Sequence, residues 1–285
     1  MNQAQHDFLN HALDGTPGAI PRDPWEDPNA NAAFRVALEG GGAGVFKPET
    51  GESGTGGLYG PMWQNEIGAY RLDQALGFNL VPTTAPFQGA DANGSSSIGS
   101  IQAWAPNSRL DPGGYDTIDQ QKMGVLDYIL GNGDRHLGNW LTQADGRPAA
   151  IDNGLTFPTS NAENLRSDFV RNVIGQQLDP SIRNALQNVN VDQLRQQLQD
   201  LNIPQEGIDG AVSRLEEVRS GTVTGQEWKK QGYLTSSDFK QIAAGNFSST
   251  GWQDAPWRPA VEQAEANSAA RRADYLARNP PTQGP

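Results

Sequence analysis

Two short polar segments constrain the fold of this chain more than any other part of its sequence. The first reads Gly-Asn-Gly-Asp-Arg-His-Leu-Gly-Asn-Trp over residues 131–140, and the second reads Ile-Asp-Asn-Gly over residues 151–154. Between them, residues 140–142 and 149–151 flank a turn at Asp145-Gly146, which predicts a short β-hairpin. Because a hairpin returns the chain to its starting point, we expect Asp152 to lie beside Asn139.

The side chains of these two segments suit phosphate and metal chemistry. Asp134 and Asn139 have the D-x-x-x-x-N spacing of kinase catalytic loops. Phosphoryl transfer needs a carboxylate near the attacking hydroxyl, oxygen ligands for Mg²⁺ and a cation on the nucleotide phosphates. A carboxylate and an amide oxygen, completed by water and phosphate, suit Mg²⁺. Asn139 and Asp152, which the predicted hairpin brings together, carry oxygens of these two kinds.

The N-terminal part of the chain favours a small sheet and one helix. Residues 33–39 alternate in polarity and residues 45–47 follow a glycine turn, which predicts a hairpin with Lys47 at its far end. Residues 64–76 predict a helix that carries Glu66 and ends at Gly77. Residues 78–86 and 97–104 predict two further strands, separated by a loop over 89–96.

Helical patterns dominate the rest of the chain. Residues 117–130 predict a helix that ends at the following glycines. Asn190-x-x-Gln193 has the form of a capping box, and residues 208–218 carry a second apolar stripe. A last helix is expected over residues 258–278. A strand-rich first third followed by helices indicates an α+β fold.

The motifs together resemble a known family. Asp134-Arg135-His136-x-x-Asn139, followed by hydrophobic-Asp-x-Gly, resembles the catalytic core of the phosphatidylinositol 3/4-kinase-like branch of the protein-kinase superfold. Residues 45–48 and 65–72 resemble the lysine strand and the following helix of that branch, so the resemblance covers residues 34–157. HipA-type bacterial toxin kinases and secretory-pathway kinases are similar more distantly.

This resemblance implies a two-lobed protein-kinase-like fold, with a small β-rich N-lobe and a larger α-helical C-lobe. We therefore expect an N-terminal arm or linker over residues 1–29 and the N-lobe over residues 30–104. The C-lobe is expected over residues 105–279, and a disordered tail over residues 280–285.

The resemblance also implies a role for each motif residue. Asp134 is expected to be the base or the acceptor-orienting residue, His136 to support the transition state, and Arg135 to order the loop. Asn139 and Asp152 are expected to bind Mg²⁺, with Mn²⁺ as a possible substitute. The expected ATP contacts are Lys47 on the phosphates, Glu66 paired with Lys47, Gln102 and Trp104 at the interlobe hinge, and Ile151 before the metal-binding aspartate.

Each of these residues also fits an ordinary structural role when taken alone. The Asp134 segment is compatible with a polar turn, Lys47 with a solvated strand end and Glu66 with a helix surface. His136 and Trp104 are equally compatible with the core. Their occurrence together in the required order favours the catalytic interpretation. The loop that covers the phosphates stays unassigned, because neither residues 40–44 nor residues 51–60 have the G-x-G-x-x-G pattern.

Composition and charge disfavour several other classes of protein. The chain has no cysteine and three histidines, which disfavours thiol catalysis, disulfides and a zinc enzyme. Its net charge of −12 opposes nucleic-acid binding. Its apolar runs are too short for a membrane span, and residues 1–15 lack a signal-peptide pattern. We expect a cytoplasmic protein, or one exported without a classical signal.

Residues 155–169 decide the expected acceptor. This segment follows the D-x-G motif and holds one base, Arg166, against Glu163 and Asp168. A phosphoinositide kinase needs cations there for the headgroup phosphates, and attraction to an anionic membrane also requires basic residues. We therefore expect an ATP- and Mg²⁺-dependent phosphotransferase acting on a protein hydroxyl or a small polar alcohol. A role as a bacterial effector or toxin is compatible with this expectation. The alternatives are a nucleotide-binding pseudokinase that serves as an interaction module, and an enzyme that transfers AMP or another group.

Overall fold

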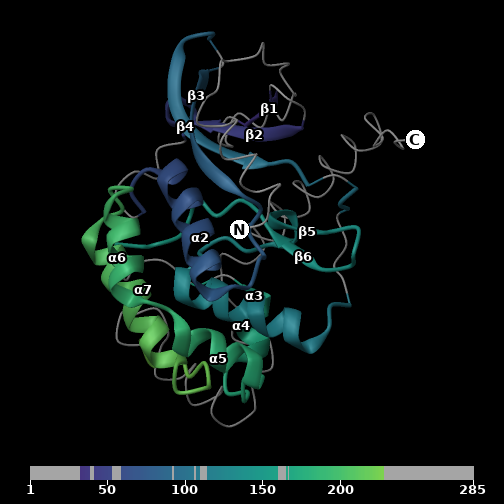
Figure 1. Cartoon of the computed structure of the whole chain (residues 1–285), viewed down its shortest axis with the longest axis vertical. Helices are drawn as coiled ribbons and strands as arrows, with labels where there is room; N and C mark the ends of the chain where they lie inside the picture. Colours follow the sequence, from purple (N-terminus) through teal and green to yellow (C-terminus); the bar gives the residue numbers. More distant parts are fainter. Residues whose placement is uncertain are drawn as a thin grey trace, which may run out of the picture.

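The computed structural model describes residues 33–38, 42–52, 59–91, 93–105, 107–109, 114–159, 165 and 167–227. Figure 1 shows a small sheet at one end of the molecule and a larger helical part at the other. The described part of the chain therefore has the expected α+β arrangement. The arm over residues 1–29, the helix over 258–278, the tail over 280–285, and Glu163 and Arg166 lie outside the described residues.

Four antiparallel strands form the sheet in the order β1-β2-β4-β3. They are β1 (Phe34–Ala37), β2 (Ala43–Pro48), β3 (Thr84–Ala90) and β4 (Ser96–Ala103). Phe46 pairs with Phe34 on one side and Ile101 on the other, and these side chains pack with Phe87 in a small buried core on one face. Because side chains alternate between the faces of a strand, Lys47 points to the opposite face.

Helix α2 (Met62–Leu76) packs between the sheet and the C-terminal helices (Figure 1) and is buried along most of its length. It ends at Gly77, whose φ of 66° lies in the left-handed region that glycine adopts without strain. The short 3₁₀ helix η1 (Glu49–Gly51) precedes it, and Glu52 Oε1 accepts a hydrogen bond from the Trp63 N–H at 2.6 Å. Side chains of α2 can therefore reach both the sheet and the C-terminal loops.

The strand expected over residues 78–86 is wrong in its first part. Strand β3 begins at Thr84 and continues through Ala90, so the loop expected over residues 89–96 is also shorter than predicted. Asp73 of α2 supplies the reason, because its Oδ2 accepts hydrogen bonds from the N–H groups of Leu80 and Val81, both at 3.0 Å. Those N–H groups are therefore not available for strand pairing.

The C-terminal elements follow their sequence signals closely. Helix α3 (Thr117–Leu130) has its predicted range: the Asp116 side chain accepts from the Asp119 N–H at 2.8 Å, and Gly131 ends the helix. The predicted hairpin is β5 (Trp140–Thr142) and β6 (Pro148–Ala150), after the 3₁₀ helix η2 (Leu137–Asn139). Asn190 caps α6 through the Gln193 N–H. The other helices of this part are α4 (Asp168–Val173), α5 (Pro180–Asn188), α6 (Val191–Gln199) and α7 (Gln205–Val218).

Candidate active site

Lys47 joins the sheet to two acidic side chains from other elements. Its Nζ forms an ion pair with Glu66 of α2 and another with Asp152 Oδ1, 2.7 Å away in the loop after β6. The Glu66 side chain is 3% exposed and that of Asp152 is 49% exposed. Burial lowers the pKa of Lys47, but the charges of Asp152 and Glu66 outweigh it, so the pKa is raised above its ordinary value. The Lys47 charge in turn lowers the pKa of Asp152.

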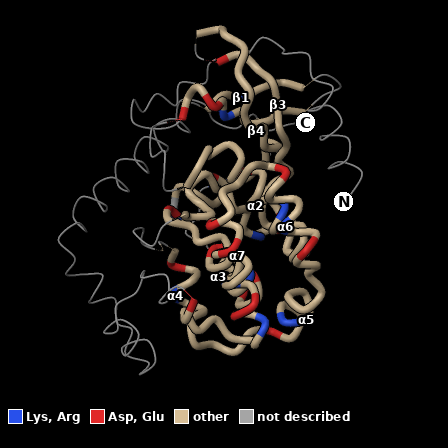
Figure 2. Tube along the Cα trace, turned by 90° about the vertical axis from the view of Figure 1, so that its left-hand side faces the viewer, with Lys and Arg blue, Asp and Glu red and all other residues tan. Residues whose placement is uncertain are grey.

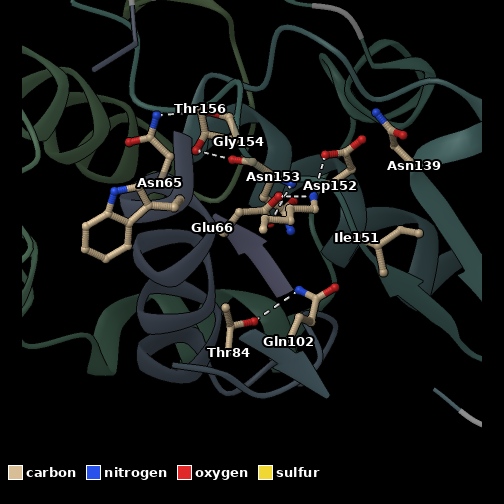
Figure 3. Close-up of polar contacts among 12 residues, drawn as sticks. Asn65, Glu66, Thr84, Gln102, Asn139, Ile151, Asp152, Asn153, Gly154 and Thr156 are labelled. Atoms are coloured by element: carbon tan, nitrogen blue, oxygen red, sulfur yellow. Dashed lines mark hydrogen bonds and ion pairs between the residues drawn. The ribbon is translucent and has the colours of Figure 1, made fainter. Parts of the chain in front are cut away.

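Helix α2 also holds the backbone of the Asp152 loop (Figure 3). Glu66 Oε2 accepts a hydrogen bond from the Asn153 N–H at 2.9 Å, and Asn65 Nδ2 donates to the Gly154 carbonyl at 2.9 Å. Asp152 has a φ of 56°, in the left-handed region that Asp tolerates better than most residues with a Cβ. Two adjacent side chains of one helix therefore fix the backbone on which the Asp152 carboxylate is mounted.

Asp134, His136 and Asn139 share the loop between α3 and β5. Asn139 Nδ2 donates to the Asp134 carbonyl at 2.7 Å and lies 3.5 Å from Asp134 Oδ2. His136 Nδ1 accepts from the Gly138 N–H at 3.0 Å, and His136 Nε2 lies 3.7 Å from Asp134 Oδ2. An accepting Nδ1 carries no proton, so this hydrogen bond assigns the proton of the neutral imidazole to Nε2, on the Asp134 side.

The hairpin brings Asn139 beside Asp152. The Ile151 N–H donates to the Asn139 carbonyl at 3.1 Å, and Figure 3 shows Asn139 and Asp152 on adjoining segments. Asn139 Oδ1 and Asp152 Oδ2 are hard oxygen donors of the kind Mg²⁺ prefers. The described residues contain no cluster of three or more His, Cys, Asp or Glu side chains that could hold a metal.

Arg135 lies buried beneath both loops and uses all of its N–H groups. Its Nε and Nη2 donate to the Asp127 carboxylate of α3, and Nη2 also donates to Asn153 Oδ1 at 2.6 Å. Its Nη1 donates to the carbonyls of Asn139 and Ile151. Five donors with five partners leave none for a substrate. This geometry favours a loop-ordering role for Arg135 over a direct part in the chemistry.

Two residues are expected at the hinge: Gln102 lies near the end of β4, and Trp104 directly follows the strand. The register of β2 and β4 places Gln102 on the sheet face that carries Lys47, and its Nε2 donates to Thr84 Oγ1 at 3.1 Å (Figure 3). The half-buried Trp104 follows the strand, and the Arg35 guanidinium lies 4.9 Å from its ring centre. Contact of Gln102, Trp104 and Ile151 with a nucleotide stays a prediction.

Sequence reasoning misses three polar residues that the structure places in this network: Asn65, Asp127 and Asn153. Asn65 adjoins Glu66, and Asn153 is the middle residue of the D-x-G motif, so both lie within segments that were already singled out. Asp127 carries a different signal, because it falls between Met123 and Leu130 on the apolar side of α3. A charged residue at such a position has to find a buried partner.

Comparisons with known proteins agree with this geometry. Residues 112–168 match the sequence profile of the family Phosphatidylinositol 3- and 4-kinase. The chain is 32% identical over 111 residues to Phosphatidylinositol 4-kinase gamma 4 of Oryza sativa subsp. japonica, covering 33% of this chain and 20% of that protein. It is 27% identical over 164 residues to Protein Rv2133c of Mycobacterium tuberculosis, covering 41% of this chain and 55% of that protein. The chain thus spans between 20% and 55% of the length of these curated relatives.

Solved structures share the fold of the chain at low identity. The Golgi casein kinase with Mn/ADP bound has a TM-score of 0.52 and 17% identity, covering 78% of this chain and 76% of that one. Hydra Fam20 with sugar has a TM-score of 0.51 and 14% identity, covering 81% and 91%. These likenesses confirm the two-lobed kinase-like fold, and the sequence relatives confirm the expected resemblance. No helix in the described part of the chain is both long and apolar enough to cross a membrane.

Proposed function

We propose that this phosphatidylinositol 3/4-kinase-like chain is a phosphotransferase that moves the γ-phosphate of ATP to an alcohol with the help of Mg²⁺ or Mn²⁺. The meeting of Lys47, Glu66 and Asp152 beside the Asp134 loop carries this proposal. A cation, hard-oxygen ligands and a part-exposed carboxylate are what phosphoryl transfer requires. The structural relative with Mn/ADP bound supports the choice of nucleotide and metal.

Each side chain has a defined task in this reaction. Lys47 holds the α- and β-phosphates, and Asn139 and Asp152 hold the metal ion, which neutralises phosphate charge when bound. Asp134 accepts the proton of the acceptor hydroxyl. The hydroxyl oxygen bonds to the γ-phosphorus, and the bond from that phosphorus to the bridging oxygen breaks, so that ADP leaves. His136 directs its Nε2 proton toward the same region and supports the charge that develops there.

We further propose a protein hydroxyl or a small polar alcohol as the acceptor. The net charge is −12, and Figure 2 shows acidic positions in the sheet and helical parts of the described chain, with fewer basic positions among them. A negative surface repels an anionic membrane and a phosphorylated headgroup, so a phosphoinositide acceptor is less favoured. We also propose a cytoplasmic location. Export without a classical signal is the alternative location, and it would suit a role as a bacterial effector.

Two other functions would use the same residues. A pseudokinase would bind Mg-ATP without turnover, and an AMP transferase would break the bond between the α- and β-phosphates. The presence of Lys47, Asp134, Asn139 and Asp152 together favours turnover over binding alone, because a binding module has no use for a base at the acceptor position.

Labelled ATP separates these functions in one experiment. The purified protein is incubated with Mg²⁺ and γ-labelled or α-labelled ATP, alone and with a lysate that is afterwards separated into protein, lipid and small molecules. We expect γ-label in the protein or small-molecule fraction for the wild type, and none for Asp134→Ala. Transfer of α-label would assign AMP transfer, and label in lipid would overturn the proposed acceptor. Mg-ATP binding without transfer to any fraction would overturn the phosphotransferase.

A further inference from the structure

A continuous series of buried interactions runs from the Lys47–Glu66 ion pair to the start of helix α4. We name this series the Glu66–Ser167 relay. Glu66 accepts from the Asn153 N–H, and Asn153 Oδ1 accepts from Arg135 Nη2. Arg135 pairs with Asp127, whose Oδ2 accepts from the Ser167 hydroxyl at 2.7 Å. The relay thus links α2, the two catalytic loops, α3 and α4.

Burial makes the relay respond as a unit. Its five side chains belong to residues that are between 0% and 2% exposed. Water does not replace a lost partner in such a site, so removing one link leaves a donor or acceptor unsatisfied inside the protein. The arrangement with all links made is therefore strongly preferred over arrangements in which one link is broken.

Arg135 connects the relay to both proposed metal ligands. Its Nη1 binds the carbonyls of Asn139 and Ile151, so it holds the backbone of one ligand and that of the residue before the other. Asn153 directly follows Asp152, and its backbone N–H is fixed by Glu66. A shift of Arg135 would therefore change the separation of the two ligands without altering either side chain.

We propose that Asn153 and Asp127 are positioning residues that couple the Lys47–Glu66 pair on α2 to the geometry of the catalytic loop. With the pair formed, Glu66 fixes Asn153, Asn153 helps to orient Arg135, and Asp127 holds the guanidinium from below. A displacement at either end of the relay therefore changes the geometry at the other end. This inference rests on the proposed phosphotransferase for its catalytic consequence, whereas the coupling itself is a property of the fold.

Two relay variants and one matched control test the coupling. Asp127→Asn keeps the shape of the side chain and removes its charge, and Asn153→Leu removes the acceptor for Arg135 at similar volume. Tyr128→Phe is the control, because it removes a partly buried hydrogen bond from the neighbouring position of α3, which the Tyr128 hydroxyl donates to Glu217 Oε2 at 2.6 Å. The measurements are steady-state kinetics with Mg-ATP and amide hydrogen exchange across α2.

We expect both relay variants to lower kcat at least about tenfold, with a smaller change in the KM for ATP, because a buried donor or acceptor loses its partner. Both should also speed amide exchange in the first turns of α2 by about tenfold. Tyr128→Phe should lower the melting temperature. Its amide exchange in α2 and its kcat should stay close to the wild-type values.

The proposed coupling is contradicted if the α2 amides exchange no faster in Asp127→Asn than in Tyr128→Phe. The coupling is also contradicted if kcat of the relay variants falls only in proportion to the fraction of folded protein. Asp127→Asn alone decides the question if Asn153→Leu does not fold. Hydrogen exchange needs no turnover, so a wild type that never transfers phosphate would refute the proposed function while the exchange data still decide the relay.

Discussion

Replacing Asp73 by Asn tests the buried carboxylate that holds the segment leading into β3. Asp73 is 0% exposed, its Oδ2 accepts from the Leu80 and Val81 N–H groups, and its Oδ1 has no hydrogen-bond partner among the described residues. Burial raises the pKa of Asp73 to about 7, although its backbone hydrogen bonds oppose the shift. The Leu80 carbonyl accepts from the Ala150 N–H at 2.9 Å, so this segment also supports the strand before Asp152.

The sign and size of the effect follow from this pKa. A carboxyl with a higher pKa in the folded than in the unfolded state adds stability that is complete below pH 3.8 and is lost as the pH rises through about 7. The whole difference corresponds to about 4 kcal/mol, of which about 2–3 kcal/mol falls between pH 5 and pH 8. Asn does not ionise and retains an oxygen for both N–H groups, so the Asp73→Asn variant should lack this pH dependence.

Urea unfolding at several pH values between 5 and 8 measures the effect. The free energy of unfolding of Asp73→Asn minus that of wild type should increase by about 2–3 kcal/mol over this range. Asp192→Asn, which removes an exposed carboxylate from α6, is the control for the loss of one negative charge. Parallel pH profiles for wild type and Asp73→Asn would refute the reasoning, because they would show that Asp73 does not titrate differently in the folded state.

Three further substitutions test the site. Asp152→Ala should weaken the Mg²⁺ dependence of ADP binding in calorimetry, because the metal loses its charged protein ligand, and an unchanged dependence would count against that role. Asp134→Asn should leave nucleotide binding nearly intact and lower turnover by about 10²–10⁴-fold, whereas equal losses of both would indicate a structural residue. Lys47→Met should lower the free energy of unfolding by about 3 kcal/mol, since Glu66 is left buried without its cation. Urea unfolding checks this last prediction, and a variant as stable as wild type would contradict it.

The sequence by itself determined the elements that carry the site, because their signals are local. Asp116 and Gly131 bound the helix over residues 117–130, and each acts on backbone groups within a few residues of itself. The Asp145-Gly146 turn similarly requires the chain to return, which places Asp152 beside Asn139. These local signals predict the α+β elements and the hairpin, whereas the kinase-like fold is expected from the resemblance of the motifs to a known family.

The tertiary structure decided which distant polar groups share a partner. Residues 78–83 have the composition of a strand, but the Asp73 carboxylate from the preceding helix takes two of their N–H groups. Asp127, Arg135 and Asn153 come from separate elements, and they meet because a buried guanidinium must satisfy all five of its donors. Such contacts depend on three-dimensional distance between elements, which local sequence patterns do not specify.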